Sequence, residues 1–311
     1  TEKGYEFKSG SDCEIILPLY REYGLDMFAK LDAEFAMIIY DHKRDSLIAA
    51  RDPIGIRPLF YGYLDDGSIV FASEAKNLVG LCGEVCPFPP GHYYADGKFV
   101  RYADLTTVTE YCHEDLETVC HTIRNKLIAG VDKRLDADAP LGFLLSGGLD
   151  SSCMVTELCG QMSDPAQLHT FTTSYPGDAS CDEWYFADLV NRACGCTGNQ
   201  ILPAPTDIEG QFENVVWHTE GLCGLSLLGV KALLEQVRSQ GYKVVLNGQC
   251  GDELMLGYER YYAFYFSWLL KTGRIRRLLR EFPQAGRHSR LHLHSLAAYV
   301  LYFDLPIVRD T

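Results

Sequence analysis

A run of Ser, Gly and Asp residues, Ser146-Gly147-Gly148-Leu149-Asp150-Ser151-Ser152, constrains this chain more than any other segment. The apolar stretch 141–145 precedes it and predicts a buried strand, and residues 150–161 predict a helix. A strand, a Gly-rich turn and a helix together present backbone N–H groups to a phosphate, and glycine lets the backbone approach closely. The serines would add hydroxyl donors, and Asp150 a carboxylate that can hold Mg²⁺ against the phosphates. The alternative is a plain strand-to-helix turn with Ser and Asp as caps.

A second segment of the same kind lies downstream. The predicted strand 244–246 runs into Asn247-Gly248-Gln249-Cys250-Gly251-Asp252-Glu253-Leu254, where a helix is expected to begin with carboxylates. Ligands bind beyond the carboxyl ends of parallel strands, so two such turns on neighbouring strands would face one triphosphate. Asp150 and Asp252 would then bridge Mg²⁺ and phosphate oxygens. The alternative is that Asp252 and Glu253 merely complement a helix dipole.

The N-terminal third of the chain has a different pattern. A capped helix is predicted over 11–23, and short apolar stretches then alternate with Asp-, Gly- and Pro-rich turns up to residue 101. This pattern predicts an α+β antiparallel layered domain over residues 1–106, followed by a polar linker at 103–113. The expected strands are 35–40, 47–50, 58–63, 68–72, 91–94 and 98–102.

From residue 114 the chain alternates helix and strand, which predicts an α/β domain over 114–311 with a parallel sheet covered by helices. Beyond Asp252 the sequence looks helical to about residue 280. The expected helices are 114–132, 150–161, 182–194, 207–218 and 226–240, and the expected strands are 141–145, 168–173, 199–202 and 243–246.

Several segments together resemble known enzymes. The loop at Ser146 resembles the pyrophosphate loop (PP-loop, S-G-G-x-D-S) of ATP pyrophosphatases, and it lacks the G-x-x-x-x-G-K-[ST] pattern of the common nucleotide loop. In chain order, six segments resemble the glutamine-hydrolysing asparagine synthetase family and its asparagine-synthetase-like relatives. They are Ser11–Leu17, Arg51–Tyr61, Phe71–Lys76, Pro89–His92, Ser146–Ser152 and Asn247–Glu253.

This resemblance implies a partial class II glutamine amidotransferase domain followed by a partial PP-loop ATP pyrophosphatase domain. The family adenylates aspartate with ATP and Mg²⁺, releases pyrophosphate, and amidates β-aspartyl-AMP with ammonia from glutamine. By motif, Asp12 would bind the α-amino group of glutamine, and Gln249 occupies a position linked to adenylate formation. Adenosine would contact Leu144, Thr173, Asn247 and Gly248; pyrophosphate would bind Ser146, Gly147, Gly148, Asp150, Ser151 and Ser152; Mg²⁺ would bind Asp150 and Asp252.

The chain also departs from the family pattern. Thr1 stands where the glutaminase nucleophile, an N-terminal Cys, is usual, and the family's Arg and N-G-E segments are absent. Its closing R-V-P-F-L-D segment is also absent, so we expect a sequence truncated at both ends. In the second loop Gln249 cannot act as a base, and Cys250 replaces a small glycine. These two changes leave open an amidotransferase or cyclase acting on another carboxylate, or an inactive member that serves as a binding subunit.

Composition narrows the partners. The chain has 311 residues, 47% of them hydrophobic, and a formal net charge of −14, which disfavours a nucleic-acid partner. It has no apolar stretch long enough for a membrane span and no signal peptide, so we expect a cytoplasmic protein with small-molecule substrates. The family resemblance suggests a homodimer.

Twelve cysteines are an unusual number. Without a secretory signal, free buried thiols are expected, for example at Cys120, Cys153 and Cys159 in their apolar contexts. The close pairs Cys82/Cys86 and Cys194/Cys196 do not have the spacing of a zinc site.

Overall fold

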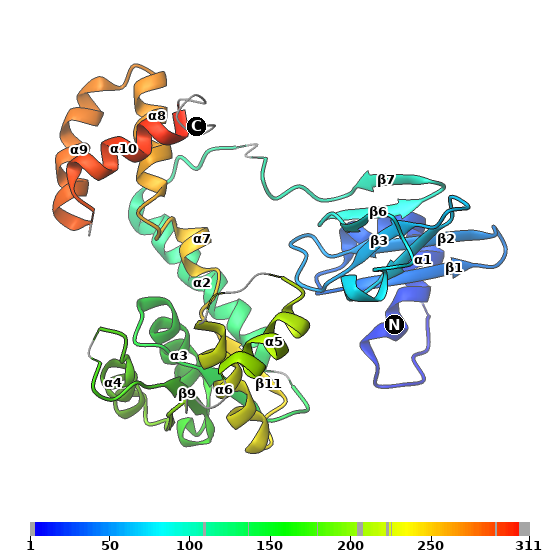
Figure 1. Ribbon diagram of the computed structural model, residues 1–311, viewed down its shortest axis with the longest axis horizontal. Coiled ribbons are helices and arrows are strands. Elements are labelled where there is room, and N and C mark those ends of the chain that lie inside the picture. Colours follow the sequence, from blue (N-terminus) through cyan, green and yellow to red (C-terminus); the bar gives the residue numbers. More distant parts are fainter. Residues whose placement is uncertain are drawn as a thin grey trace. The chain divides into compact units, whose positions relative to one another are not determined.

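The computed structural model describes residues 4–107, 110–135, 137–178, 180–203, 208–221, 224, 226–289 and 291–304 (Figure 1). The chain divides into two compact units. The first comprises Thr1–Glu114 and Val216–Leu222, and the second comprises Asp115–Val215 and Cys223–Thr311.

The first unit is built from short antiparallel strands. They form a four-stranded sheet of order β1-β2-β6-β7 and a three-stranded sheet of order β4-β3-β5. All six expected strands are present, and β5 is an additional strand that the sequence pattern did not predict. The strands are β1 Ala36–Asp41, β2 Ser46–Arg51, β3 Phe60–Tyr63, β4 Ile69–Ala72, β5 Val85–Pro87, β6 His92–Ala95 and β7 Lys98–Arg101.

The helical segment before these strands differs from the expected single helix over 11–23. It begins as a 3₁₀ turn, η1 (Asp12–Ile15), continues as α1 (Ile16–Tyr23), and is followed by a second 3₁₀ segment, η2 (Gly24–Lys30). Pro18 lies in the first turn of α1, where its missing N–H breaks no helical hydrogen bond. The proline is therefore compatible with α1.

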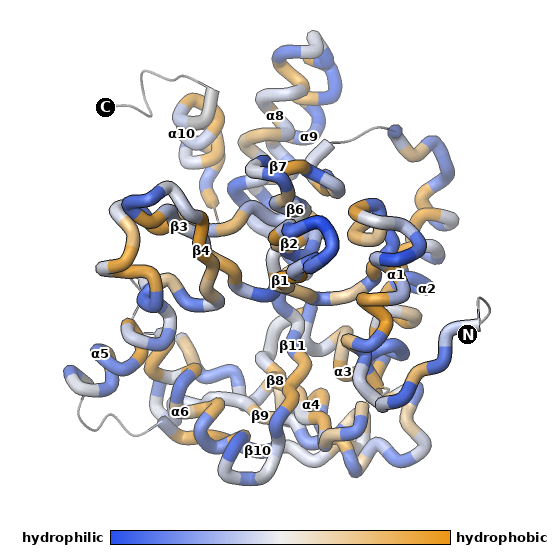
Figure 2. Tube along the Cα trace, turned by 90° about the vertical axis from the view of Figure 1, so that its right-hand side faces the viewer, coloured by the Kyte–Doolittle hydropathy of each residue, from blue (hydrophilic) through white to orange (hydrophobic). Residues whose placement is uncertain are grey.

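Strand β2 contributes side chains to two hydrophobic clusters, one on each of its faces. Ile48 and Ala50 pack with Met27 and Phe28 of η2, whereas the intervening Ala49 packs in a separate cluster with Phe88. Because successive side chains of a strand point to opposite faces, β2 is buried on both sides of the four-stranded sheet. The second cluster also holds side chains of the three-stranded sheet, whose strand β4 is hydrophobic along its length (Figure 2).

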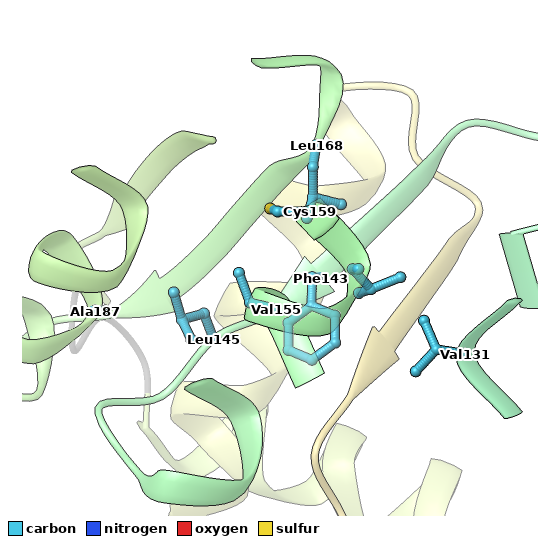
Figure 3. Packing of buried hydrophobic residues seen from close by; sticks show 8 residues of the cluster. Val131, Phe143, Leu145, Val155, Cys159, Leu168 and Ala187 are labelled. Carbon is cyan, nitrogen blue, oxygen red and sulfur yellow. The ribbon is translucent and has the colours of Figure 1, made fainter. Parts of the chain in front are cut away.

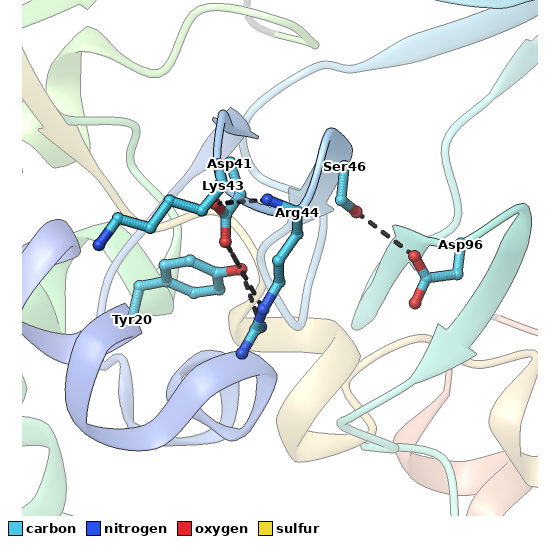
Figure 4. A network of polar contacts seen from close by, with 6 residues as sticks. All are labelled: Tyr20, Asp41, Lys43, Arg44, Ser46 and Asp96. Atoms are coloured by element: carbon cyan, nitrogen blue, oxygen red, sulfur yellow. Dashed lines mark hydrogen bonds and ion pairs between the residues drawn. The ribbon is translucent and has the colours of Figure 1, made fainter.

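A polar network closes the turn between β1 and β2 (Figure 4). Asp41 Oδ1 accepts from the backbone N–H of Lys43 at 2.9 Å and of Arg44 at 3.3 Å, and the Tyr20 hydroxyl donates to Asp41 Oδ2 at 3.0 Å. Ser46 reaches Asp96 in the β6–β7 turn at 3.4 Å. The network fixes the edge of the sheet against α1.

The second unit contains a parallel sheet of order β10-β9-β8-β11, as expected. Each strand alternates with helices in the sequence, and each expected element lies within a few residues of its predicted bounds. The strands are β8 Leu141–Leu144, β9 His169–Thr173, β10 Thr197–Ile201 and β11 Val244–Asn247. The helices are α2 Leu116–Leu135, α3 Leu149–Gln161, α4 Trp184–Cys194, α5 Ile208–Thr219, α6 Ser226–Ser239, α7 Gly251–Met255, α8 Tyr261–Lys271, α9 Ile275–His288 and α10 Leu293–Asp304, with 3₁₀ turns η3 Ala75–Asn77 and η4 Pro165–Gln167 elsewhere.

Helices cover both faces of this sheet. On one face Phe143 and Leu145 pack with Val155 of α3 and Ala187 of α4 (Figure 3). On the other face Phe171 of β9 packs with side chains of α6. Strands buried on both faces read as continuous apolar runs, and that is why residues 141–145 showed no alternation.

The last three helices, α8 to α10, pack on one another around Phe266, Leu269 and Leu296. Among the residues that the structure describes, no helix has the length and hydrophobicity needed to cross a bilayer.

Candidate active site

The Ser146 loop connects β8 to α3, as the sequence predicted. Gly148 is the N-cap residue of α3 and has no side chain that could accept a hydrogen bond from the first backbone N–H groups of the helix. Leu149 is 85% exposed at the start of the helix. The first N–H groups of a helix have no partner within it, and its N-terminus is the positive end of the helix dipole, so this turn is suited to an anion.

The serine hydroxyls of the loop bond within it. The buried Ser151 hydroxyl lies 2.8 Å from Ser146 Oγ and 3.0 Å from the Ser146 carbonyl oxygen. Ser152 donates to the Gly148 carbonyl oxygen at 2.7 Å. These hydroxyls hold the shape of the loop, and a role in binding phosphate stays a prediction.

The second loop lies directly against the start of α3. A Cβ added at Gly248 would fall 2.7 Å from the Ser151 nitrogen and 2.9 Å from its Cα. A Cβ at Gly251 would meet the Asp150 carboxylate. Gly248 is required because its backbone and that of Ser151 approach more closely than a side chain permits, whereas the neighbour of Gly251 is a side chain.

Strand register brings the predicted nucleotide contacts to one sheet edge. Leu144 and Asn247 are paired as the last residues of β8 and β11, and Thr173 ends the neighbouring strand β9. Asn247 Oδ1 accepts from the backbone N–H of Gln249 at 3.0 Å, which shapes the turn, and the Gln249 side chain is exposed. The predicted residues are thus brought together, while their roles remain untested.

Asp150 and Asp252 begin α3 and α7, and both carboxylates are half-buried. The Asp150 carboxylate lies against Gly251, next in sequence to Asp252. In the part of the chain that the structure describes, no group of three or more His, Cys, Asp and Glu side chains is arranged to hold a metal ion. Mg²⁺ commonly takes one or two carboxylates together with substrate phosphates, so this pair fits Mg²⁺ that arrives with a nucleotide.

Cys250 adopts a left-handed backbone conformation, with φ of 71° and ψ of 4°. Non-glycine residues pay about 1–2 kcal/mol in this region. We expect Cys250→Gly to raise the free energy of unfolding of the second unit by about 1 kcal/mol in urea denaturation. The control is Cys250→Ala, which removes the thiol and keeps the Cβ; an equal gain in both variants would contradict the strain argument.

Asp12, the predicted glutamine ligand, is exposed at the start of η1 in the first unit. The neighbouring segment is fixed by Glu14, whose carboxylate accepts from the backbone N–H groups of Lys8 at 2.7 Å and Ser9 at 2.8 Å. The Ser11 hydroxyl accepts from the Cys13 N–H at 3.3 Å. These bonds hold the turn and leave the Asp12 side chain open to solvent, and its role stays a prediction.

Glu220, which directly follows α5 in the sequence, has a structural role in the first unit. Within the first unit its carboxylate accepts from the backbone N–H groups of Ala75 at 2.7 Å and Lys76 at 2.8 Å. These donors hold the pKa of Glu220 below its usual value, aided by the charge of Lys76. Glu220 is thereby joined to two residues that lie 145 and 144 positions earlier in the chain. No local pattern in the sequence predicts such a contact.

Comparisons with known proteins agree with this architecture. Residues 122–302 match the family described as asparagine synthase, and residues 1–88 match a glutamine amidotransferase domain. The chain is 33% identical to amidase chyE of Penicillium rubens, over 83% of this chain and 45% of that protein. It is 33% identical to asparagine synthetase [glutamine-hydrolyzing] 2 of Arabidopsis thaliana, over 82% of this chain and 46% of that protein. It is 34% identical to a probable asparagine synthetase [glutamine-hydrolyzing] of Schizosaccharomyces pombe, over 82% of this chain and 49% of that protein.

The chain thus spans about half the length of the curated relatives it matches. The asparagine synthase match covers more than half of the chain and includes both loops of the candidate site. The chain belongs to the asparagine synthase family.

Proposed function

We propose that the second unit binds ATP and transfers its adenylyl group to a carboxylate substrate, as the first half of an asparagine synthetase reaction. The observation that carries the proposal is the close approach of Gly248 and Gly251 to the first turn of α3. Two loops at the ends of β8 and β11 would enclose one triphosphate, with the helix N-terminus facing its negative charge.

In the proposed reaction a carboxylate oxygen of aspartate attacks the α-phosphorus of ATP, and pyrophosphate leaves. Charge develops on pyrophosphate, and the backbone N–H groups of residues 147–152 would stabilise it there. Leu144 and Thr173 would contact adenosine together with Asn247. Mg²⁺ held by Asp150 and Asp252 would neutralise phosphate charge.

Ammonia would then attack the acyl carbon of the adenylate and release AMP, giving asparagine. Water must be excluded until that step, because the adenylate would otherwise hydrolyse. We propose that glutamine is the source of ammonia, with Asp12 binding its α-amino group, and that the two domains extend over 1–106 and 114–311.

A second candidate function rests on the second loop. Gln249 cannot accept a proton, and Cys250 adds an exposed thiol to the second loop at a position with a left-handed backbone. One relative is named an amidase, so a carboxylate other than aspartate is the alternative acceptor.

The test follows pyrophosphate release by the protein with ATP, Mg²⁺ and each candidate carboxylate, with ammonia or glutamine as the nitrogen donor. We expect release that requires aspartate, with asparagine as product. Release with another carboxylate only would establish the alternative acceptor. ATP binding without any release would contradict both proposals and indicate an inactive binding subunit.

A further inference from the structure

Three cysteines gather on one side of the second unit, away from the candidate active site. Cys159 lies near the end of α3, and Cys194 and Cys196 flank the turn that joins α4 to β10. The Cys159 and Cys196 sulfur atoms are 3.8 Å apart, and Cys194 Sγ lies 3.8 Å from the Thr156 hydroxyl. Cys159 is 8% exposed, and the other two are half-buried.

We propose that Cys159 and Cys196 are a redox-active dithiol that a peroxide converts to a disulfide. The nucleotide chemistry proposed above uses neither residue, and the site stands independently of that function.

The geometry suits a disulfide. The sulfurs must approach by about 1.8 Å to reach the length of an S–S bond, a distance that side-chain rotation can supply. Cys159 lies in the last turn of α3, whereas Cys196 lies in the turn between α4 and β10, so one of the two sulfurs is carried by a turn.

Oxidation would leave the side-chain oxygen of the buried Asn191 with a hydrogen bond. The Cys196 thiol lies 3.6 Å from Asn191 Oδ1, which also accepts from the Thr170 hydroxyl at 2.7 Å. When Cys196 loses its hydrogen, that oxygen keeps the stronger of its two bonds. Disulfide formation therefore avoids the cost of a newly unpaired buried acceptor.

The two thiols are not equivalent. Burial raises the pKa of Cys159 to about 12. Burial also raises the pKa of Cys196, but the S–H group that Cys159 donates to it opposes that rise. Because Cys159 is buried and Cys196 is only half-buried, Cys196 is the thiol that an oxidant reaches first, and Cys159 resolves the product.

The chemistry balances with one hydrogen peroxide. The Cys196 thiolate attacks one peroxide oxygen and breaks the O–O bond, giving a sulfenic acid and hydroxide, which takes the proton that the thiol had lost. Cys159 sulfur then attacks the Cys196 sulfur, the S–O bond breaks, and the leaving oxygen departs as water with the Cys159 proton. Overall, two thiols and one peroxide give one disulfide and two waters.

The bridge would tie the end of α3 to the α4–β10 turn. Because the chain between the two cysteines becomes a closed loop, the unfolded state loses conformational freedom. We expect the Tm of the second unit to rise on oxidation and to return to its starting value with dithiothreitol.

The test treats the protein with hydrogen peroxide, alkylates the remaining thiols under denaturing conditions, and maps non-reduced chymotryptic peptides by mass spectrometry. We expect the Cys159 peptide to be joined to the peptide that carries Cys194 and Cys196. The link should persist in Cys194→Ser and disappear in Cys196→Ser and in Cys159→Ser, with thermal unfolding of the reduced proteins reporting whether each variant is folded.

The matched control is Cys153, an exposed thiol on the same helix. Cys153→Ser should leave the link unchanged. The proposal is wrong if Cys159 remains free for alkylation at peroxide amounts that oxidise Cys153. It is also wrong if Cys194→Ser removes the link, since the partner of Cys159 would then be Cys194.

Discussion

Gly248→Ala is expected to lower the rate of pyrophosphate release from ATP by about a hundredfold or more. Its Cβ would fall 2.7 Å from the backbone nitrogen of Ser151, closer than non-bonded atoms allow. The neighbouring atom belongs to the backbone of α3, so no side-chain rotation can relieve the contact. Either the second loop or the first turn of the helix must move, and a shift of an ångström in a phosphate site is enough for this loss.

Gly251→Ala provides a graded comparison. Its Cβ would meet the Asp150 carboxylate, which is the end of a side chain and can rotate away. We therefore expect the rate of pyrophosphate release to fall less than in Gly248→Ala. We also expect that rate to depend less on Asp150 than it does in the parent protein. A larger loss of rate in Gly248→Ala than in Gly251→Ala indicates a backbone clash. Equal losses would indicate that any added side chain in the loop lowers the rate.

Gly160→Ala is the matched control on the same helix. A Cβ at Gly160 has no atom within 4 Å, and its backbone is helical. The change should leave pyrophosphate release unaltered and stabilise the helix by up to about 1 kcal/mol. ATP binding and circular dichroism would be measured for all variants, and a folded Gly248→Ala protein with unchanged release would contradict the proposed site.

The sequence predicted the parallel sheet and the two loops because their signals are local. The apolar run 141–145 and the Gly-Gly turn after it are adjacent in the chain, and so are strand 244–246 and its turn. Local patterns report what neighbouring residues do together. The close approach of the two loops followed from the strand order, which places β8 beside β11.

Contacts between distant residues could not be predicted in this way. Strand β5 has three residues, ends in Pro87, and exists because it pairs with β3. The 3₁₀ segment η2 is fixed by burial of Met27 and Phe28 against the sheet. Both lack a repeating pattern of their own.

The cysteines show how far a pattern of apolar neighbours can be trusted. Cys120, Cys153 and Cys159 were all expected to be buried, but only Cys159 is, and the other two are exposed. On α3, Cys159 packs with Val155 and Leu158, whereas Cys153 lies on the other side of the helix. The helical spacing of α3 distinguishes the buried Cys159 from the exposed Cys153. The apolar residues around them in the sequence do not.

The segment Arg51–Tyr61 carries the second large prediction, which concerns stability. Asp52 is 1% exposed, and its carboxylate accepts four backbone N–H groups, those of residues 54, 55, 56 and 57, at 2.6–3.1 Å. Arg51 donates to the carbonyl oxygens of Gly55, Arg57 and Phe88 at 2.7–2.8 Å. This loop is therefore held by two adjacent charged side chains that serve its own backbone.

We expect Asp52→Ala to lower the free energy of unfolding of the first unit by about 3–5 kcal/mol, because four part-buried hydrogen bonds to the backbone are lost at once. Urea denaturation followed by amide hydrogen exchange in β1 and β2 measures this unit directly. Asp66→Ala is the control, since Asp66 is exposed and its carboxylate accepts the backbone N–H group of Ser68 at 2.8 Å. A loss no larger in Asp52→Ala than in Asp66→Ala would contradict the argument.

The same carboxylate predicts a pH dependence with a definite sign. Burial by itself would raise the pKa of Asp52, but the four N–H donors outweigh it and hold the pKa below the ordinary value of 3.8. A depressed pKa in the folded state means that the ionised side chain stabilises the fold above pH 3.8, and that this stabilisation is lost as the pH falls through the folded pKa. The Asn side chain of Asp52→Asn cannot ionise. The difference in free energy of unfolding between this variant and the parent protein should therefore be constant above pH 3.8 and become smaller below it. A difference that stays constant down to the acid transition would show that Asp52 acts by shape alone, whereas narrowing would assign the stability of this loop to its charge.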